Sequence, residues 1–156
     1  MELQGERQIN QIDAAIASCD PDKVSIAWPR PGADGYVVGT TDNPDPEEQH
    51  AKVGRTTGLT RGRLTREGHL TWIDYGGLGM LRFDDVTVYE SAEQPFAGPG
   101  DSGSLIYGEN SRLAAGLLFA GADTGGKYGT GTTLAIPVVK VLAALRTELV
   151  VSGGAQ

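Results

Sequence analysis

Six segments of the chain have the composition of β-strands, and they follow one another at short intervals between residues 51 and 137. Each is rich in Val, Leu, Ile, Thr or aromatic residues, and glycine-containing turns separate them. Short strands at regular spacing are typical of all-β sandwiches and barrels. The pattern therefore predicts a closed or nearly closed antiparallel barrel. The six segments are 51–59, 61–75, 80–90, 104–108, 112–122 and 132–137.

The C-terminal end differs from this β-rich middle. Apolar residues recur there at the i, i+3, i+4 spacing of an amphipathic helix, and Pro137 stands at a suitable first helical position. One helix is therefore expected to close the chain, and residues 150–156 are expected to form a frayed tail. The apolar positions of this helix are Val138, Val141, Leu142, Leu145 and Leu149.

The N-terminal third is harder to assign. In residues 9–17 the three isoleucines have helical spacing, whereas Ile12, Ala14 and Ile16 alternate as in a strand. Taken alone, this pattern slightly favours a helix. Residues 19–49 contain five of the eight prolines and end in an acidic run, which predicts a linker. Two short stretches within it have strand composition, 24–28 and 35–39.

Composition argues against several classes of function. The net charge of −7 disfavours a nucleic-acid-binding protein, which needs a basic face. A single cysteine, Cys19, excludes a disulfide within the chain and is expected to be a buried or half-buried small apolar residue. The polar N-terminus shows no signal peptide, and no stretch is apolar enough to span a membrane, so a cytoplasmic protein is expected. No cluster of metal ligands or phosphate-binding glycine loop is apparent, so neither a metal nor a cofactor is expected.

The segment 98–104, GPGDSGS, is the strongest candidate for chemistry. Gly100 and Gly103 permit backbone conformations that other residues adopt only at a cost, and the turn presents Ser102. In such a turn the N–H groups of Gly100 and Ser102 can point at one spot beside the serine oxygen. A nucleophile with donors placed for an oxyanion is what acyl transfer requires. Gly, Asp and Ser are also ordinary turn residues, so this segment alone does not establish an activity.

Four motifs in order resemble the second barrel of the chymotrypsin/trypsin family, especially bacterial members such as the streptogrisins and α-lytic protease. The resemblance covers about residues 50–149. It implies an all-β fold, an antiparallel six-stranded Greek-key barrel of trypsin-like type with one C-terminal helix. It also implies that residues 1–18 are a remnant of a first barrel, that 19–49 are the linker and that 150–156 are a disordered tail. The four motifs are VGRTTGLTRGRL (53–64), GDSGS (100–104), GLLFAG (116–121) and GTTLAIPVVKVL (131–142).

The same resemblance gives residues 9–17 another interpretation. In the family, a strand at the end of the first barrel carries the triad aspartate, and INQIDAAIA places Asp13 at that position. A strand is therefore expected there instead of a helix, the alternative being that Asp13 is a solvated surface carboxylate. The family's general base is a histidine upstream of this aspartate, and no histidine precedes Asp13 here. His50 and His69 both follow it, and each is expected to be a surface residue.

The resemblance thus implies the C-terminal half of a trypsin-like serine endopeptidase. Peptide bonds would be hydrolysed through an acyl-enzyme on Ser102 once a histidine-bearing first barrel completes the site. That barrel would come from a longer form of this chain or from a second chain. The alternative is a non-catalytic peptide-binding or assembly module on the same fold, which uses the edge of GLLFAGA (116–122) for β-augmentation. The expected partners are a peptide or protein substrate and either a second chain or a second copy, which would cover an apolar face around Ile12, Asp13 and Ile16.

Two further expectations concern the surroundings of Ser102. The resemblance implies a substrate pocket without an obvious charge, and hence an uncharged or apolar substrate side chain. Where the family has a serine next to the triad aspartate, this chain has Phe119. In bacterial relatives an arginine of a G-R-T-T-G motif pairs with the aspartate before the nucleophile, which predicts an Arg55–Asp101 ion pair here. The residues predicted to bind substrate are Phe96, Ala97, Phe119, Ala120 and Gly121.

Overall fold

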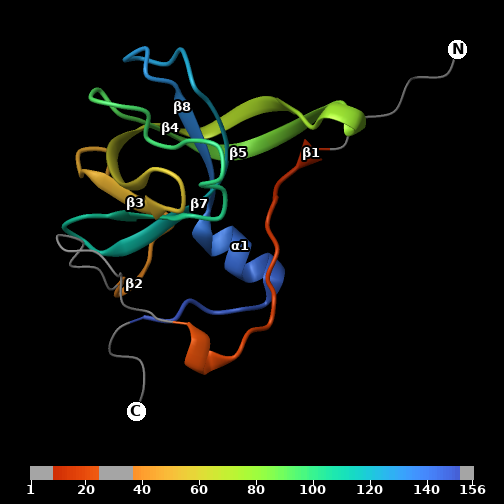
Figure 1. Ribbon diagram of the computed structural model, residues 1–156, viewed down its shortest axis with the longest axis vertical. Coiled ribbons are helices and arrows are strands. Elements are labelled where there is room, and N and C mark those ends of the chain that lie inside the picture. Colours follow the sequence, from red (N-terminus) through yellow and green to blue (C-terminus); the bar gives the residue numbers. More distant parts are fainter. Residues whose placement is uncertain (1–8, 25–36, 152–156) are drawn as a thin grey trace, which may run out of the picture.

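The computed structural model describes residues 9–24 and 37–151, and six of its strands close into a barrel (Figure 1). Each of these six pairs antiparallel with two others, in the ring order β3–β4–β5–β8–β7–β6 and back to β3. The predicted barrel is therefore confirmed, and a strand lies in each of the six segments, although residues 55–57 of the first segment form a turn. The strands are β3 (His50–Gly54), β4 (Gly58–Asp74), β5 (Met80–Glu90), β6 (Leu105–Gly108), β7 (Leu113–Ala122) and β8 (Thr132–Pro137).

Strand β4, of 17 residues, is the longest described strand, and with β5 it extends beyond the barrel as a hairpin, at the right of Figure 1. The pairing continues to Asp74↔Met80, and three register shifts bend it on the way. A short 3-10 turn, η2 (Gly76–Leu78), closes the hairpin. Leu78 and Met80 at this end are 76% and 55% exposed, so the hairpin presents apolar side chains to the outside.

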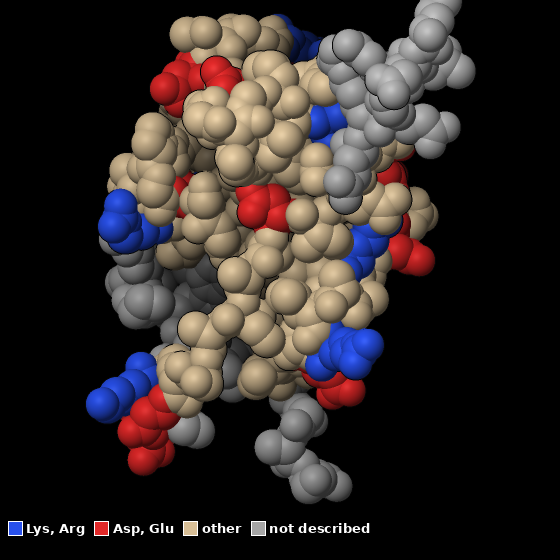
Figure 2. All heavy atoms as spheres, turned by 90° about the vertical axis from the view of Figure 1, so that its right-hand side faces the viewer, with Lys and Arg blue, Asp and Glu red and all other residues tan. Residues whose placement is uncertain are grey.

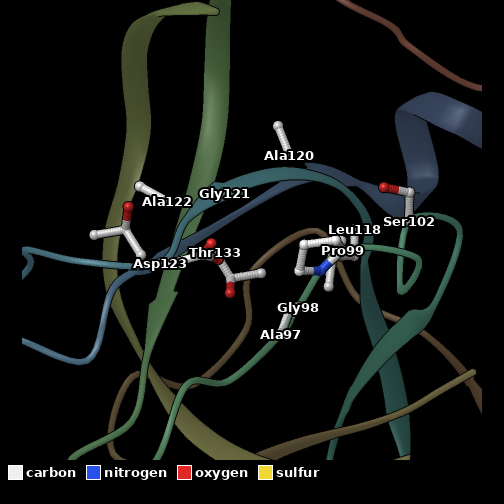
Figure 3. A pocket seen from close by; sticks show the side chains of 11 residues that line it. Ala97, Gly98, Pro99, Ser102, Leu118, Ala120, Gly121, Ala122, Asp123 and Thr133 are labelled. Carbon is white, nitrogen blue, oxygen red and sulfur yellow. The ribbon is translucent and has the colours of Figure 1, made fainter. Parts of the chain in front are cut away.

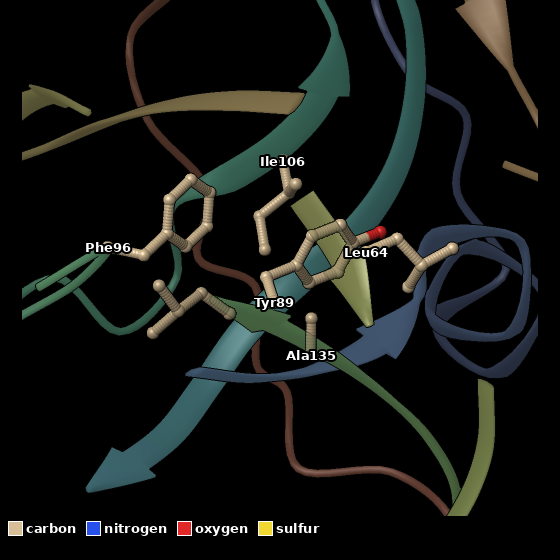
Figure 4. Close-up of a cluster of buried hydrophobic side chains, with 6 residues drawn as sticks. Leu64, Tyr89, Phe96, Ile106 and Ala135 are labelled. Atoms are coloured by element: carbon tan, nitrogen blue, oxygen red, sulfur yellow. The ribbon is translucent and has the colours of Figure 1, made fainter. Parts of the chain in front are cut away.

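The interior of the barrel is filled by a cluster of buried side chains from five strands, β4 to β8, and from the segment before the nucleophile turn (Figure 4). Tyr89 and Phe96 stack at its centre with their rings 5.8 Å apart. Burial of a side chain of this size stabilises the fold by about 1.5–3 kcal/mol. The cluster consists of Leu64, Tyr89, Phe96, Ile106, Leu118 and Ala135.

The predicted C-terminal helix is present as α1 (Val138–Leu145), but it is shorter than expected. Arg146 adopts the left-handed conformation and ends the helix, so Leu149 lies beyond it. Pro137 is the last residue of β8 and not the first helical residue. Val138 packs against a second buried cluster that includes Ala51 and Tyr107, which fixes the helix against the outside of the barrel.

Two further short strands lie at the margin of the sheet. β1 (Ile9–Asn10) pairs parallel with β5, and β2 (Gly39–Thr40) pairs parallel with β7. The first interpretation of residues 9–17 as a helix is wrong, and the expected strand is limited to its first two residues. Residues 25–28 of the candidate strand 24–28 and most of the tail 150–156 lie outside the described residues.

The described part of the linker contains β2 and a 3-10 turn, η1 (Pro21–Lys23). Cys19 precedes this turn and is exposed, so the expectation of a buried or half-buried cysteine is wrong. Among the described residues, no helix has the length and apolar character needed to cross a membrane.

Candidate functional site

The glycine-rich turn joins β5 to β6 and is held by its own backbone. Asp101 N donates to Gly98 O at 3.1 Å, Ser104 N donates to Asp101 O at 3.0 Å, and Gly103 N donates to Leu118 O of β7 at 2.7 Å. Gly100 and Gly103 have φ values of +96° and +87°, a region that favours glycine. This geometry leaves the Gly100 and Ser102 N–H groups without an acceptor among the described residues. Two unused donors beside an exposed serine are what an oxyanion hole needs, and this assignment stays a prediction.

The carboxylate of Asp101 is buried beneath this turn and is paired with Lys52 of β3. Lys52 Nζ lies 2.8 Å from Asp101 Oδ2, and both side chains are fully buried. Thr57 donates its hydroxyl to the same oxygen at 2.6 Å, and Thr56 N donates to Oδ1 at 2.8 Å. Gly98 N also donates to Oδ2, at 3.1 Å. Asp101 thus joins the nucleophile turn to the β3–β4 turn.

The predicted Arg55–Asp101 ion pair is wrong. Arg55 is exposed, and no ion pair among the described residues includes it. The reason is strand geometry: β3 ends at Gly54, so Arg55 already lies in the turn, whereas Lys52 is on the strand face that points inward. His50 and Gly54 lie on the same face of β3 as Lys52 and are also buried, although Ala51 between them is buried too, on the side that faces the second cluster.

Two opposing effects determine the ionisation of Asp101. Burial raises the pKa of this carboxyl, but hydrogen bonds from Lys52, from the Thr57 hydroxyl and from backbone N–H groups lower it by more. The net result is a pKa below its ordinary value, so Asp101 is ionised at neutral pH. A charged, fully bonded carboxylate can hold the turn that precedes Ser102 in one conformation.

A pocket of about 270 Å³ opens beside Ser102 (Figure 3). Ser102 lies at one side of it, and Asp123 lies with Thr133 at the other. Ala97, Ala120 and Gly121 line the pocket, and their contact with substrate stays a prediction. Asp123 also lines it and was missed, because it stands in a glycine-rich loop whose residues resemble those of any turn.

The two phenylalanines predicted to bind substrate do not line this pocket. Phe96 is 3% exposed and belongs to the core of the barrel. The side chain of Phe119 leaves β7 between the pocket residues Leu118 and Ala120, and its ring packs 5.0 Å from that of Phe83. The pairing of β7 with β8 shifts register between Leu118 and Ala120, and the contact of the Phe119 ring with Phe83 accompanies its absence from the pocket lining.

Asp13 is exposed and accepts a hydrogen bond from the hydroxyl of Tyr75. The ring of Tyr75 stacks on Phe83, 6.0 Å away, and Phe83 in turn contacts Phe119. An aromatic row therefore lies between the backbone of β7 and Asp13. Ser102 Oγ donates to Phe119 O at 3.3 Å, so the structure does not bring Asp13 and Ser102 into direct contact. The role of Asp13 as the triad aspartate stays a prediction.

The two histidines differ in environment, and neither forms a hydrogen bond with Ser102 within the described part of the chain. His50 is 1% exposed, so its expected surface position is wrong. Its ring meets the edge of Tyr89 at 5.3 Å, and its Nδ1 has no hydrogen-bond partner among the described residues. Burial lowers the pKa of His50, because the charged imidazolium loses hydration.

His69 is partly exposed and lines a second hollow, of about 390 Å³, next to the pocket. The two cavities share the strand segment formed by Ala120, Gly121 and Ala122. The outer wall of the hollow is the β4 side of the long hairpin, including Arg66 and Trp72. An extended chain that lies along Ala120–Ala122 would therefore meet a hollow on either side.

Comparison with solved structures identifies proteins of the same fold. Cellulomonas bogoriensis chymotrypsin is 25% identical, with a TM-score of 0.58, and the match covers 78% of this chain and 58% of that one. Thermobifida fusca protease A is 22% identical, with a TM-score of 0.59, over 78% of this chain and 57% of that one. A glutamic-acid-specific serine protease, which uses a histidine triad in substrate binding, is 21% identical, with a TM-score of 0.55, over 80% of this chain and 61% of that one.

The chain thus spans about three fifths of the length of these solved proteins. No family model matches the sequence, and no curated protein matches it significantly. The similarity is therefore one of three-dimensional structure. At 21–25% sequence identity it shows a shared fold and does not show a shared activity.

Proposed function

We propose that this chain, which has the fold of the bacterial chymotrypsin-like serine proteases, supplies the nucleophile half of a serine endopeptidase. In this proposal Ser102 attacks the peptide carbonyl, and the N–H groups of Gly100 and Ser102 stabilise the oxyanion. The observation that supports it is the Lys52–Asp101 ion pair, which fixes the turn so that Ser102 stands exposed beside a pocket. A buried charge is costly to desolvate, and a turn held by several bonds to it can keep Ser102 in one position.

The missing part of this site is a general base. Within the described residues no imidazole lies in hydrogen-bond contact with Ser102, whose hydroxyl donates to a backbone carbonyl instead. A serine without a base is a weak nucleophile. We therefore propose that a histidine-bearing barrel, from a longer form of this chain or from a second chain, completes the site. The matched proteases are long enough to hold such a second unit, since this chain spans only 58% of the first.

The surface offers a place for that unit. On the face in Figure 2, one acidic side chain lies near the centre, most other charged side chains lie toward the margins, and most of the area between them is uncharged. Ile16 and Leu78 are 64% and 76% exposed, although large apolar side chains are usually covered. A partner that covered them would also approach Asp13, which lies between Ile9 and Ile16 in the chain. This agrees with a partner that contributes a histidine next to Asp13.

A chimera tests the proposal directly. The histidine-bearing first barrel of Cellulomonas bogoriensis chymotrypsin would be fused ahead of residue 9, and hydrolysis of peptide 4-nitroanilides would be followed. We expect hydrolysis that disappears in Ser102→Ala and in a chimera whose first-barrel histidine is replaced by alanine. A folded chimera that binds the substrates but does not hydrolyse them would contradict the proposal.

One observation favours a second candidate function, that of a peptide-binding module. Beyond Leu118, the outer end of β7 pairs with β8 on one side, while β6 pairs with β7 only as far as Leu117. The segment Ala120–Ala122 therefore has a free edge that can accept an extended peptide by β-augmentation. In that case the chimera would bind peptides, and Ser102→Ala would leave the affinity unchanged.

A further inference from the structure

We propose that Tyr75 is a positioning residue for the completed site: its hydroxyl holds the carboxylate of Asp13 by one oxygen and leaves the other oxygen open to the incoming histidine. The inference rests on the proposed function, because only a completed site contains that histidine. It also gives the long β4–β5 hairpin a role, since Tyr75 stands at the outer end of this hairpin, directly before its 3-10 turn. The sequence pattern did not single out this tyrosine.

The segment that carries Asp13 has little support of its own. β1 ends at Asn10, and of residues 12–19 Asp13 alone forms a hydrogen bond with another described residue. In that bond the Tyr75 hydroxyl donates to Oδ2 of Asp13. An exposed carboxylate on an irregular segment is otherwise free to change rotamer. The position of this carboxylate therefore depends on Tyr75.

Tyr75 itself is fixed by its backbone and by its ring. Its N–H donates to Gly79 O at 3.0 Å across the end of the hairpin. Its ring stacks at 6.0 Å on that of Phe83, which is 2% exposed. The ring of Phe83 contacts that of Phe119, whose carbonyl oxygen accepts the hydroxyl of Ser102. A row of packed rings thus fixes the Tyr75 hydroxyl relative to the strand beside the nucleophile.

The hydrogen bond from Tyr75 leaves half of the carboxylate available. Oδ2 of Asp13 accepts the hydroxyl, whereas Oδ1 accepts no hydrogen bond from a described residue. A carboxylate that orients a histidine needs such a free acceptor for the ring N–H, and it must not turn away from the ring. Burial, the hydrogen bond to Asp13 and the charge of Asp13 raise the pKa of the Tyr75 hydroxyl, so it remains a donor at neutral pH.

A double-mutant cycle in the chimera tests this role. Tyr75→Phe removes the hydroxyl and keeps the ring that packs on Phe83. We expect kcat to fall about tenfold with KM unchanged, because the orientation of the base is lost and substrate binding is not. In the presence of Asp13→Asn, Tyr75→Phe should cause no further loss, because it acts through that carboxylate. Tyr128→Phe is the matched control: its ring is 38% exposed and faces the ammonium of Lys127, so kcat and KM should not change.

The contact can also be tested in the chain alone, without catalysis. The side-chain carboxyl carbon of Asp13 gives an NMR signal that responds to hydrogen bonding. We expect this signal to shift in Tyr75→Phe and to stay unchanged in Tyr128→Phe. An unshifted signal in Tyr75→Phe would overturn the inference, because the hydroxyl would then not hold the carboxylate in solution.

The kinetic results distinguish the failure of this inference from that of the proposed function. An active chimera in which Tyr75→Phe leaves kcat unchanged, or raises KM alone, would overturn the positioning role and leave the endopeptidase intact. An equal loss of kcat with and without Asp13→Asn would do the same, because Tyr75 would then act on the fold in general and not through Asp13. A chimera that is inactive with Tyr75 in place would contradict the endopeptidase and, with it, the role of Tyr75.

Discussion

Lys52 Nζ and Asp101 Oδ2 lie 2.8 Å apart in a position that is closed to solvent, and their contact joins the first strand of the barrel to the turn that carries Ser102. The residues are far apart in the sequence, so the contact depends on the folded barrel. Gly54 is part of the same arrangement, since a Cβ at that position would stand 2.3 Å from Asp101 Oδ1. The nucleophile turn is thus fixed from β3 and from the β3–β4 turn.

Lys52→Met should destabilise the fold strongly, because it leaves the buried carboxylate of Asp101 without its counter-charge. Loss of one partner of a buried ion pair typically costs about 3–5 kcal/mol. Urea unfolding would measure the free energy of unfolding. Arg55→Met is the control: Arg55 is exposed and unpaired with Asp101, so a change within about 0.5 kcal/mol is expected. Equal effects of the two substitutions would show that the assignment of the ion pair is wrong.

Stability should fall in acid because of Asp101. Its pKa is lowered in the folded state, so the unfolded chain binds the proton first, and the stabilisation is complete above the unfolded pKa of about 3.9. It is lost as the pH falls below that value toward the folded pKa. Unfolding curves between pH 6 and pH 2 would check this. Asp101→Asn, if it folds, should show a weaker dependence on pH below about 4; an unchanged dependence would assign acid unfolding to other groups.

His50 should cause an additional loss of stability on acidification, which begins at a higher pH than the loss caused by Asp101. Burial lowers the pKa of this imidazole, so the unfolded chain takes up a proton near its ordinary pKa of about 6.5 while the folded chain stays neutral. Stability is therefore full above about pH 6.5 and decreases as the pH falls toward the folded pKa. His50→Gln should remove the change between pH 7 and pH 5, as measured by thermal unfolding. His69→Gln, at a partly exposed site, should not remove it.

Gly54→Ala should disturb the nucleophile turn, because the new methyl group would overlap both Oδ1 and Cγ of Asp101. Overpacking of this kind costs about 1–3 kcal/mol, and here it acts directly on the ion pair. Unfolding in urea and the amide NMR signals of Gly100 and Ser102 would report the two effects. Gly77→Ala is the matched control, since nothing lies within 4 Å of a Cβ at that position. Unshifted Gly100 and Ser102 signals in Gly54→Ala would contradict the proposed coupling.

Much of the fold could be predicted because strand composition and glycine turns alternate regularly from residue 51 to residue 137. The partner of Asp101 could not be obtained from the G-R-T-T-G motif, because a motif does not say where the strand ends. Once β3 is known to end at Gly54, alternation along the strand turns Lys52 inward and leaves Arg55 in the turn. His50 was expected at the surface because the start of β3 was not known either; it is the first residue of that strand and is buried.

The surroundings of Ser102 were predicted only in part. The turn follows from local sequence, whereas Ala120 and Gly121 of β7 were expected from the resemblance to the family, and both line the pocket. Asp123 could not be foreseen, because the path of a glycine-rich loop depends on tertiary contacts and not on the composition of the loop. Asp13 lies three residues after the end of β1, in a segment without regular structure. The hydrogen bond from Tyr75 to its carboxylate joins residues far apart in the sequence, so the local pattern could not indicate it.

We propose that Ser102 and its turn are competent for acyl transfer, although no imidazole forms a hydrogen bond with Ser102 among the described residues. The most direct test is the rate at which a fluorophosphonate probe labels Ser102, followed by intact-mass spectrometry with and without added imidazole. Because Ser102 is exposed, imidazole from solution can reach it. We expect labelling of the chain alone to be as slow as in Ser102→Ala, and to rise with imidazole concentration only when Ser102 is present. Rapid labelling of Ser102 in the absence of imidazole would show that the chain carries its own base, and no labelling at any imidazole concentration would show that the turn is not competent.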